Sequence, residues 1–271
     1  MTRKDVPKHS LGARRQIRRG MMSNLHFDPW LTQRLQKDAY LLSLDEALVR
    51  RSQSLEAPEI VDLKRLLNQP VFISCKVATA DLPWASLLED LGFRLVDTAV
   101  LLEKPLGGKV EIPAGRAEVR WAKAADRKQV MAVAGRSFRF SRFHLDVKIP
   151  TATAHRLKAE WAGNFFTGGR GEAMLVAVVE DRVAAFLLLL QGPEKDVTID
   201  LMAVDPDHRQ VGLASHLIAQ AMVHYGDQGR DIMLVGTQIA NVPSLRLYEK
   251  LGFRVCATNY VFHYHGPGSR V

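Results

Sequence analysis

Residues 202–217 read MAVDPDHRQVGLASHL, and this stretch decides the fold. An apolar strand ends at Asp205-Pro206-Asp207, and a helix follows whose apolar residues recur at helical spacing, at Leu213, Leu217, Ile218 and Ala221. Gly212 and Ala214 carry no bulky side chain, so a ligand can approach the backbone closely. The first N–H groups of a helix attract phosphate, and Arg209 would add a cation. This pattern predicts either a pyrophosphate-binding turn or a plain strand–turn–helix whose glycine relieves crowding.

A second set of residues, further along the chain, decides between these interpretations. A strand at 232–235 is followed by Asn241, Ser244, Tyr248 and Leu251-Gly252-Phe253. Together with Val204, Pro206, Arg209, Gly212 and Ala214, they resemble the two signatures of the GNAT superfamily of N-acetyltransferases. The resemblance implies the GNAT fold, of the α+β class, in which a mixed, mostly antiparallel twisted sheet is flanked by helices. It also implies acetyl-CoA as co-substrate.

The resemblance assigns roles to individual residues. It implies that acetyl-CoA is bound by Met202, Ala203, Val204, Arg209, Gln210, Val211, Gly212, Leu213, Ala214, Asn241 and Ser244. Tyr248 is the candidate general acid, because a phenol within hydrogen-bond reach can protonate a departing thiolate. Without the family context it would be a tyrosine that packs its helix onto the sheet. Asn241 could instead, or in addition, cap the helix that contains Pro243.

Asp200 lies inside an otherwise apolar strand and is the second candidate catalytic residue. It could take the proton of an ammonium group, directly or through water, or orient the amine. A carboxylate satisfied by a neighbouring strand is the alternative. The sequence does not identify the general base.

An internal echo predicts two related halves. LLEDLGFRLVDT at 87–98 and LYEKLGFRVCAT at 247–258 match in seven residues at an offset of 160. Each reads as a helix closed by a glycine and followed by a strand. The first copy has Leu88 in the place of Tyr248, and the chain has no glycine between Gly20 and Gly92. We therefore expect a degenerate first lobe that cannot form a bare phosphate-binding turn.

The span from about Ser74 to His265 further resembles the two-lobed nucleotide-sugar amine acetyltransferases of the dTDP-fucosamine acetyltransferase type. That resemblance implies that Ser141, Arg142, Phe143 and Tyr260 contact the acceptor. Arg142 suits a phosphate, with a surface salt bridge as the alternative, and Tyr260 could instead pack in the core. The chain departs from that type in its basic tail and in the histidines that flank Tyr264, His263 and His265.

The expected domains are a basic tail at 1–24, a degenerate α/β lobe at 25–109 and an acetyltransferase domain at 110–271. A turn-rich joint at 104–109 separates the two lobes. In the first lobe we expect strands at 39–44, 71–78 and 94–103 and helices at 45–54, 58–67 and 83–91. In the second we expect helices at 126–136 and 152–164, strands at 174–180, 183–191 and 198–204, and then helix, strand, helix and strand.

Composition narrows the partners. Residues 1–24 hold seven of the 37 Lys and Arg residues, so the net charge of +8 belongs largely to the tail. The tail interleaves no aromatic residues for base stacking, so nucleic acid is not an expected partner. Two cysteines and nine histidines without ligand spacing predict no disulfide framework and no metal. With no secretory signal or apolar run long enough for a membrane span, we expect a cytoplasmic monomer or homodimer.

Three functions are compatible with these residues. The first is N-acetyl transfer to a small-molecule amine, with an amino sugar, free or nucleotide-linked, as the favoured acceptor. The second is N-acetyl transfer to a protein or peptide amine, which the basic tail could help to engage. The third is a CoA-binding module without turnover, and the joint presence of Arg209, Gly212, Ala214, Asn241 and Tyr248 argues against it.

Overall fold

The structure, a computed structural model, describes residues 24–44, 58–108, 110–113 and 117–268. The chain forms two compact units. Unit 1 takes the chain up to Val77, Asp81–Leu95 and the residues from Phe262 on, whereas unit 2 takes Ala78–Ala80 and Val96–Val261. The predicted joint at 104–109 thus falls within unit 2, because the strand before it pairs with a strand of that unit. The predicted helix at 45–54 and all of the predicted tail except Asn24 lie outside the described residues.

Unit 1 contains a small sheet in which two neighbouring strands, β2 and β3, run parallel. Its elements are β1 (Leu25–Phe27), α2 (Pro29–Leu35), β2 (Asp38–Leu42), α4 (Pro58–Leu67), β3 (Val71–Ala78), α5 (Leu82–Asp90) and the end of β10 (Arg254–His265). The strand order is β1-β2-β3-β10. β1 pairs antiparallel with β2, and β2 pairs parallel with β3 along its full length, from Asp38 opposite Val71 to Leu42 opposite Cys75.

Unit 2 contains the larger sheet. Its elements are β4 (Arg94–Pro105), β5 (Glu118–Trp121), the short 3-10 helices η1 (Ala124–Asp126), η2 (Asn164–Thr167) and η3 (Pro206–His208), α6 (Arg127–Ser137), α7 (Arg142–Leu145), α8 (Thr151–Gly163), β6 (Ala173–Val179), β7 (Arg182–Gln191), β8 (Asp196–Val204), α9 (Leu213–Asp227), β9 (Ile232–Gln238), α10 (Val242–Lys250) and the first part of β10. The strand order is β10-β4-β9-β8-β7-β6-β5. β8 and β9 run parallel, whereas β4–β9, β5–β6, β6–β7 and β7–β8 are antiparallel. The predicted mixed, mostly antiparallel α+β sheet is confirmed.

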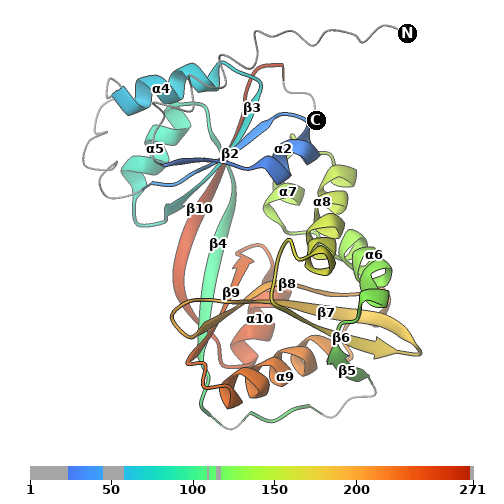
Figure 1. Cartoon of the computed structure of the whole chain (residues 1–271). Helices are drawn as coiled ribbons and strands as arrows, with labels where there is room; N and C mark the ends of the chain where they lie inside the picture. The colour runs from blue at the N-terminus through green and yellow to red at the C-terminus, as the bar shows by residue number, and fades with distance from the viewer. Residues whose placement is uncertain (1–23, 45–57, 109, 114–116, 269–271) are drawn as a thin grey trace, which may run out of the picture. The chain divides into compact units, whose positions relative to one another are not determined.

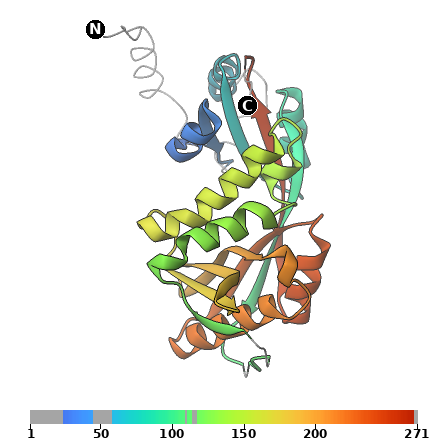
Figure 2. The ribbon, with the colours of Figure 1, turned by 90° about the vertical axis from the view of Figure 1, so that its right-hand side faces the viewer.

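Helices cover both faces of this sheet, and the alternation of side chains along β7 explains how. Leu187 and Leu189 pack in the core beneath α9 and α10, while Phe186 and Leu188 pack in a separate core beneath α6 and α8. This is the two-residue period of a strand that is buried on both faces. In Figures 1 and 2, α6 and α8 lie on one side of β6–β8 and α9 lies on the other.

The longer predicted elements within the described residues agree with the structure to within two residues at each end. β1, α2, β5 and α7 were not predicted. The start of α2 was nevertheless visible in the sequence, since Asp28 caps the helix by accepting the N–H of Leu31 at 2.7 Å and Pro29 follows it. None of the described helices combines the length and the apolar character that crossing a bilayer requires.

Candidate active site

The two parallel strands of unit 2, β8 and β9, are paired along only the first half of their length. β8 pairs with β9 from Asp196 opposite Ile232 to Ile199 opposite Val235, although β8 continues to Val204 and β9 to Gln238. Each strand keeps its other neighbour to the end: β7 stays with β8 and β4 stays with β9. The facing backbone edges of the two strand ends are therefore open to an extended ligand, whose polar groups could take the place of a ladder partner.

A β-bulge at Asp200 accompanies the separation. Leu188 lies opposite Leu201 and Leu189 opposite Ile199, so Asp200 is the extra residue of β8. Before the bulge, Val197 and Ile199 belong to the α9 core, and after it Leu201 and Ala203 belong to the α6 core. A bulge bends its strand and switches the faces of the residues that follow. We therefore infer that the bulge turns β8 away from β9.

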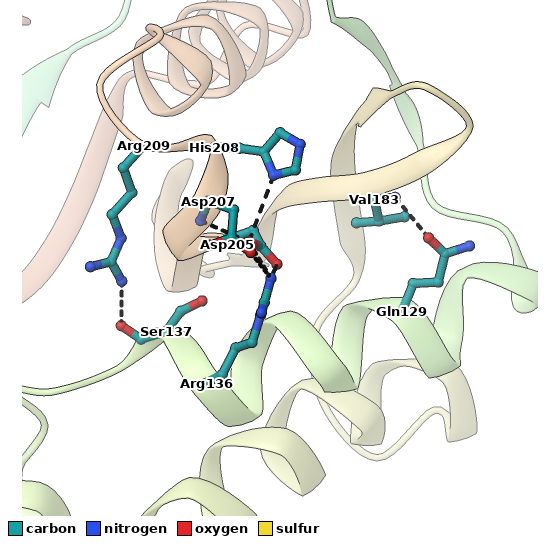
Figure 3. A network of polar contacts seen from close by, with 8 residues as sticks. All are labelled: Gln129, Arg136, Ser137, Val183, Asp205, Asp207, His208 and Arg209. Atoms are coloured by element: carbon teal, nitrogen blue, oxygen red, sulfur yellow. Dashed lines mark hydrogen bonds and ion pairs between the residues drawn. The ribbon is translucent and has the colours of Figure 1, made fainter.

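The loop that follows β8 is fastened to the end of α6 (Figure 3). Arg136 donates three hydrogen bonds to the Asp205 carboxylate, one of 2.9 Å from Nε to Oδ2 and two from one terminal nitrogen to both oxygens. The same terminal nitrogen donates to Asp207 at 2.9 Å. Burial would raise the pKa of Asp205, but the hydrogen bonds from Arg136 and from the Asp207 N–H hold it below its usual value. Arg209 donates to the Ser137 carbonyl at 2.8 Å. These contacts fix the predicted phosphate-binding turn before α9 begins.

Gly212 forms the turn itself. It is the N-cap of α9 with a φ of 85° and no side-chain capping bond, and Gln210 before it also has a left-handed φ of 65°. A Cβ added at Gly212 would meet no heavy atom within 4 Å. Leu213 is buried and anchors the helix, whereas residues 209–212 are exposed. The first N–H groups of α9 therefore lie beside an open turn, and such groups at a helix start attract an anion.

α10 carries the residues predicted to contact the CoA arm. The Asn241 side chain donates to Thr237 Oγ1 at 3.3 Å and makes no capping bond, so the predicted capping role of that side chain is wrong. Its backbone carbonyl accepts the N–H groups of Ser244 and Leu245 instead. The side chains of Asn241 and Ser244 are both partly exposed.

Tyr248, on the same helix, is 4% exposed and belongs to the α9 core. Its ring meets the edge of Phe253 at 5.5 Å between centroids. Burial raises the pKa of Tyr248 above the usual value, so the phenol keeps its proton at neutral pH. A proton on this hydroxyl is the state that a general acid requires.

The second catalytic candidate, Asp200, is held by neighbouring side chains. Arg170 donates to both carboxylate oxygens, with 2.7 Å between Nε and Oδ2, and Trp161 Nε1 donates to Oδ2 at 3.0 Å. The partners come from α8 and the segment before β6, not from an adjacent strand. These contacts favour a positioning role for Asp200 over removal of a proton from the acceptor.

Of the four predicted acceptor residues, all in unit 2, Ser141 and Phe143 are buried and Arg142 and Tyr260 are partly exposed. Ser141 starts α7, and its Oγ lies 2.6 Å from Nδ1 of His144, whose Nε2 lies 3.1 Å from Nδ1 of His155. Burial, and then the charges of His155 and Lys158, lower the pKa of His144 to about 4, so this ring is neutral at pH 7. Phe143 is buried, Arg142 lies over its ring at 4.9 Å, and Tyr260 is half-buried on β10.

Sequence reasoning missed Lys158, Trp161 and Arg170, which surround Asp200. Lys158 is only 9% exposed, and its Nζ lies 4.9 Å from the Phe138 ring and 4.8 Å from the Trp161 ring. The signal was present, because Lys158 follows Ala154 by one helical turn and stands on the buried stripe of α8.

Comparison with known proteins agrees with this geometry. Residues 137–253 match the Acetyltransferase (GNAT) family. The spore coat polysaccharide biosynthesis protein SpsD of Bacillus subtilis (strain 168) is 31% identical over 140 residues, which cover 51% of this chain and 47% of that protein. An uncharacterized N-acetyltransferase of Mycobacterium tuberculosis (strain ATCC 25618 / H37Rv) is 26% identical over 86 residues, which cover 32% and 55%. The chain thus spans about half the length of these curated relatives.

Solved structures show the same fold. A GCN5-related N-acetyltransferase from Sphaerobacter thermophilus aligns with a TM-score of 0.63 at 14% identity, over 91% of this chain and 78% of that one. A tandem GNAT protein from the clavulanic acid biosynthesis pathway aligns with a TM-score of 0.57 at 13% identity, over 85% and 76%. This likeness shows the fold. The residues that match the GNAT acetyltransferase family, 137–253, include the open turn before α9 and Tyr248.

Proposed function

We propose that this protein is an acetyl-CoA-dependent N-acetyltransferase that acts on the primary amine of an amino sugar, free or nucleotide-linked, in a ternary complex. One observation carries the proposal. The end of β8, which has separated from β9, leads through residues 205–211 to the bare turn at Gly212, so an extended thioester and its diphosphate have adjoining places to bind. The similarity to a spore coat polysaccharide biosynthesis protein supports a sugar as the acceptor.

The turn and the strand ends hold the two parts of the co-substrate. The N–H groups of residues 210–214 bind the diphosphate, and Arg209 lies beside them. The backbone of Met202, Ala203 and Val204 takes the pantetheine arm as a ladder partner and polarises the carbonyl to be attacked. Asn241 and Ser244, at the start of α10, contact that arm from the side of β9.

Tyr248 supplies the proton at the end of the reaction. Acetyl-CoA provides an acetyl group activated as a thioester, and transfer to the amine leaves a thiolate. The Tyr248 hydroxyl is protonated at neutral pH and donates to this sulfur. Burial raises the pKa of the phenol, and the same apolar surroundings also raise the proton affinity of a thiolate that enters them, so the transfer stays feasible.

The acceptor binds beside α7 and α8. Ser141, Arg142 and Phe143 line one side of its site, and Tyr260 lines another. Asp200 holds Arg170 and Trp161 in place through the hydrogen bonds described above. A neutral amine is the nucleophile, so turnover rises with pH until the acceptor ammonium has lost its proton.

Release of CoA in the presence of a panel of amines tests the proposal. The panel contains glucosamine, dTDP- and UDP-linked amino sugars, and a peptide with a free amine, and acetyl-CoA binding is measured by calorimetry in parallel. We expect acetyl-CoA to bind and an amino sugar to give the fastest release. If acetyl-CoA binds but only the peptide is acetylated, the acceptor is a protein or peptide amine and not a sugar. Failure of acetyl-CoA to bind would contradict the proposed function as a whole.

We further propose a cytoplasmic setting. Cys75 is buried and Cys256 is exposed, and both are free thiols, which suits a reducing compartment.

A further inference from the structure

Lys158 is buried beside aromatic rings on the α6 face of unit 2. Its ammonium faces the rings of Phe138 and Trp161, and the side chain is more than nine-tenths buried. Among the described residues, no carboxylate lies within ion-pair distance of Nζ: the neighbouring Asp200 is already bound by Arg170 and Trp161. Burying an ammonium group beside aromatic rings costs free energy unless another group binds to it.

Three charged side chains of neighbouring elements act on the Lys158 ammonium. Arg142 on α7 and Arg170 before β6 are close enough to disfavour a charge on Lys158, and Asp200 on β8 is the one carboxylate that favours it. His144 is also a neighbour of Lys158, and its ring is neutral at pH 7. His155 in turn neighbours His144. At Lys158 itself, two arginines thus oppose the charge, and the one carboxylate that favours it is bound by Arg170. Burial first, and then the two arginines, lower the pKa of Lys158 to about 7.

We propose that Lys158, with Arg142 and Arg170, binds an oxyanion carried by the acceptor, a phosphate or a carboxylate, so that the enzyme selects anionic amines. This inference rests on the proposed function and names the substrate class of the same site. An oxyanion bound to Lys158 would neutralise its ammonium and replace the water that this buried group has lost. The aromatic rings hold the ammonium in place, so little side-chain entropy is lost on binding.

Matched acceptors and matched variants test the selectivity. Glucosamine is compared with glucosamine 6-phosphate and with its 6-carboxylate, the aminouronic acid, as acceptors for the full-length protein. We expect one of the two anionic sugars to exceed glucosamine by at least about 10-fold in kcat/KM, equivalent to one ion pair of about 1.4 kcal/mol. The better of the two identifies the oxyanion.

The substitution Lys158→Met removes the charge and keeps the length of the side chain. We expect it to fold, because methionine suits an aromatic environment, and to abolish most of the preference for the anionic sugar. Lys128→Met, on an exposed part of α6, removes one charge from the same unit and leaves that preference unchanged. An equal loss of turnover on all three sugars in Lys158→Met would overturn the proposal and point to a role in proton transfer.

A second readout does not depend on turnover. The pKa of Lys158 is measured by NMR on isotope-labelled lysine in the full-length protein, in sulfate and in chloride at equal ionic strength, with Lys158→Met to assign the signal. Sulfate should raise this pKa by about one unit, since a bound oxyanion favours the ammonium. Suppose that acetyl-CoA binds, that the pKa of Lys158 is the same in sulfate and in chloride, and that the enzyme shows no preference among the sugars. This result would overturn the anion site and leave the proposed function standing. If acetyl-CoA does not bind but sulfate raises the pKa, the proposed function fails and the anion site stands.

Discussion

The same succession of elements occurs twice along the chain. β3, α5 and β4 follow one another with the spacing of β9, α10 and β10, and α5 and α10 each have nine residues. Both helices end at a glycine with nearly the same φ, 84° at Gly92 and 83° at Gly252. In both, the phenylalanine that follows donates its N–H to the residue five positions earlier, Leu88 or Tyr248, at 2.9 Å. The echo in the sequence thus corresponds to equal local structures.

The two copies differ in the parallel pair that precedes each helix. β2 stays paired with β3 to its last residue, Leu42, whereas β8 leaves β9 after Ile199 and continues to Val204. The bulge at Asp200 and the bare turn at Gly212 belong to the second copy. We therefore propose that a half-fold of this kind is a scaffold, and that it binds acetyl-CoA only where a bulge opens the parallel pair and a glycine leaves the following helix without a side-chain cap.

The largest effect on turnover is expected at Tyr248, the position at which the first copy has Leu88. Tyr248→Phe should lower kcat by 10- to 1000-fold and leave the acetyl-CoA dissociation constant nearly unchanged, because the ring still fills the core while the proton donor is lost. Stopped-flow measurement of CoA release gives kcat, and calorimetry gives the affinity. Tyr225→Phe, another buried tyrosine of unit 2, is the control and should keep its turnover. Wild-type turnover in Tyr248→Phe would remove the hydroxyl from the mechanism.

Gly212→Val should make the second copy resemble the first, whose sequence has no glycine between Gly20 and Gly92. A β-branched residue at a φ of 85° is strained by about 1–3 kcal/mol, and its side chain would fill the open space at the start of α9. We expect acetyl-CoA affinity to fall about 100-fold, or about 2.7 kcal/mol. Gly226→Ala, near the other end of the same helix and also with open space, is the matched control. Unchanged affinity in Gly212→Val would place the diphosphate elsewhere.

Most of this architecture could be predicted because its signals are local. Helical spacing located α9 at Leu213 and Leu217, and the glycine stops located the ends of α5 and α10. The bulge could not be predicted in the same way. Asp200 was visible as a carboxylate in an apolar strand, but its partner Arg170 is thirty residues away in sequence and approaches it only in the folded chain. Lys158 was missed for a related reason, since a lysine on a buried stripe has meaning only once its neighbours are known.

Leu88→Tyr places into the first copy the tyrosine that we propose as the general acid of the second. Leu88 is fully buried, so the larger and polar ring should lower the free energy of unfolding by about 1–3 kcal/mol, measured by urea denaturation. Turnover should stay at the wild-type level, because the first copy has no open parallel pair. Leu88→Met, which conserves volume, should cost less. A gain of acetyl-CoA binding in Leu88→Tyr would show that the first copy lacks only this side chain.

The smallest effect concerns the framework that precedes the second copy. Asp126 accepts from Arg120 at 2.7 and 3.0 Å and from the Lys123 N–H at 2.7 Å, and so joins β5 to the start of α6. The hydrogen bonds from Arg120 outweigh burial and lower the pKa of Asp126. A carboxyl with a lowered folded-state pKa stabilises the protein above its unfolded pKa of about 3.9, and this contribution is lost as the pH falls through the folded-state value.

Asp126→Asn should therefore reduce the free energy of unfolding by about 1–2 kcal/mol at pH 7 and by less as the pH falls below about 4. Urea denaturation of both proteins at several pH values measures this difference. Arg120 and Asp126 lie outside the repeated elements, so the loss should leave the acetyl-CoA affinity of the folded protein unchanged. A variant that loses affinity along with stability would show that the start of α6 and the turn at its other end, where Arg136 holds Asp205, behave as one rigid support.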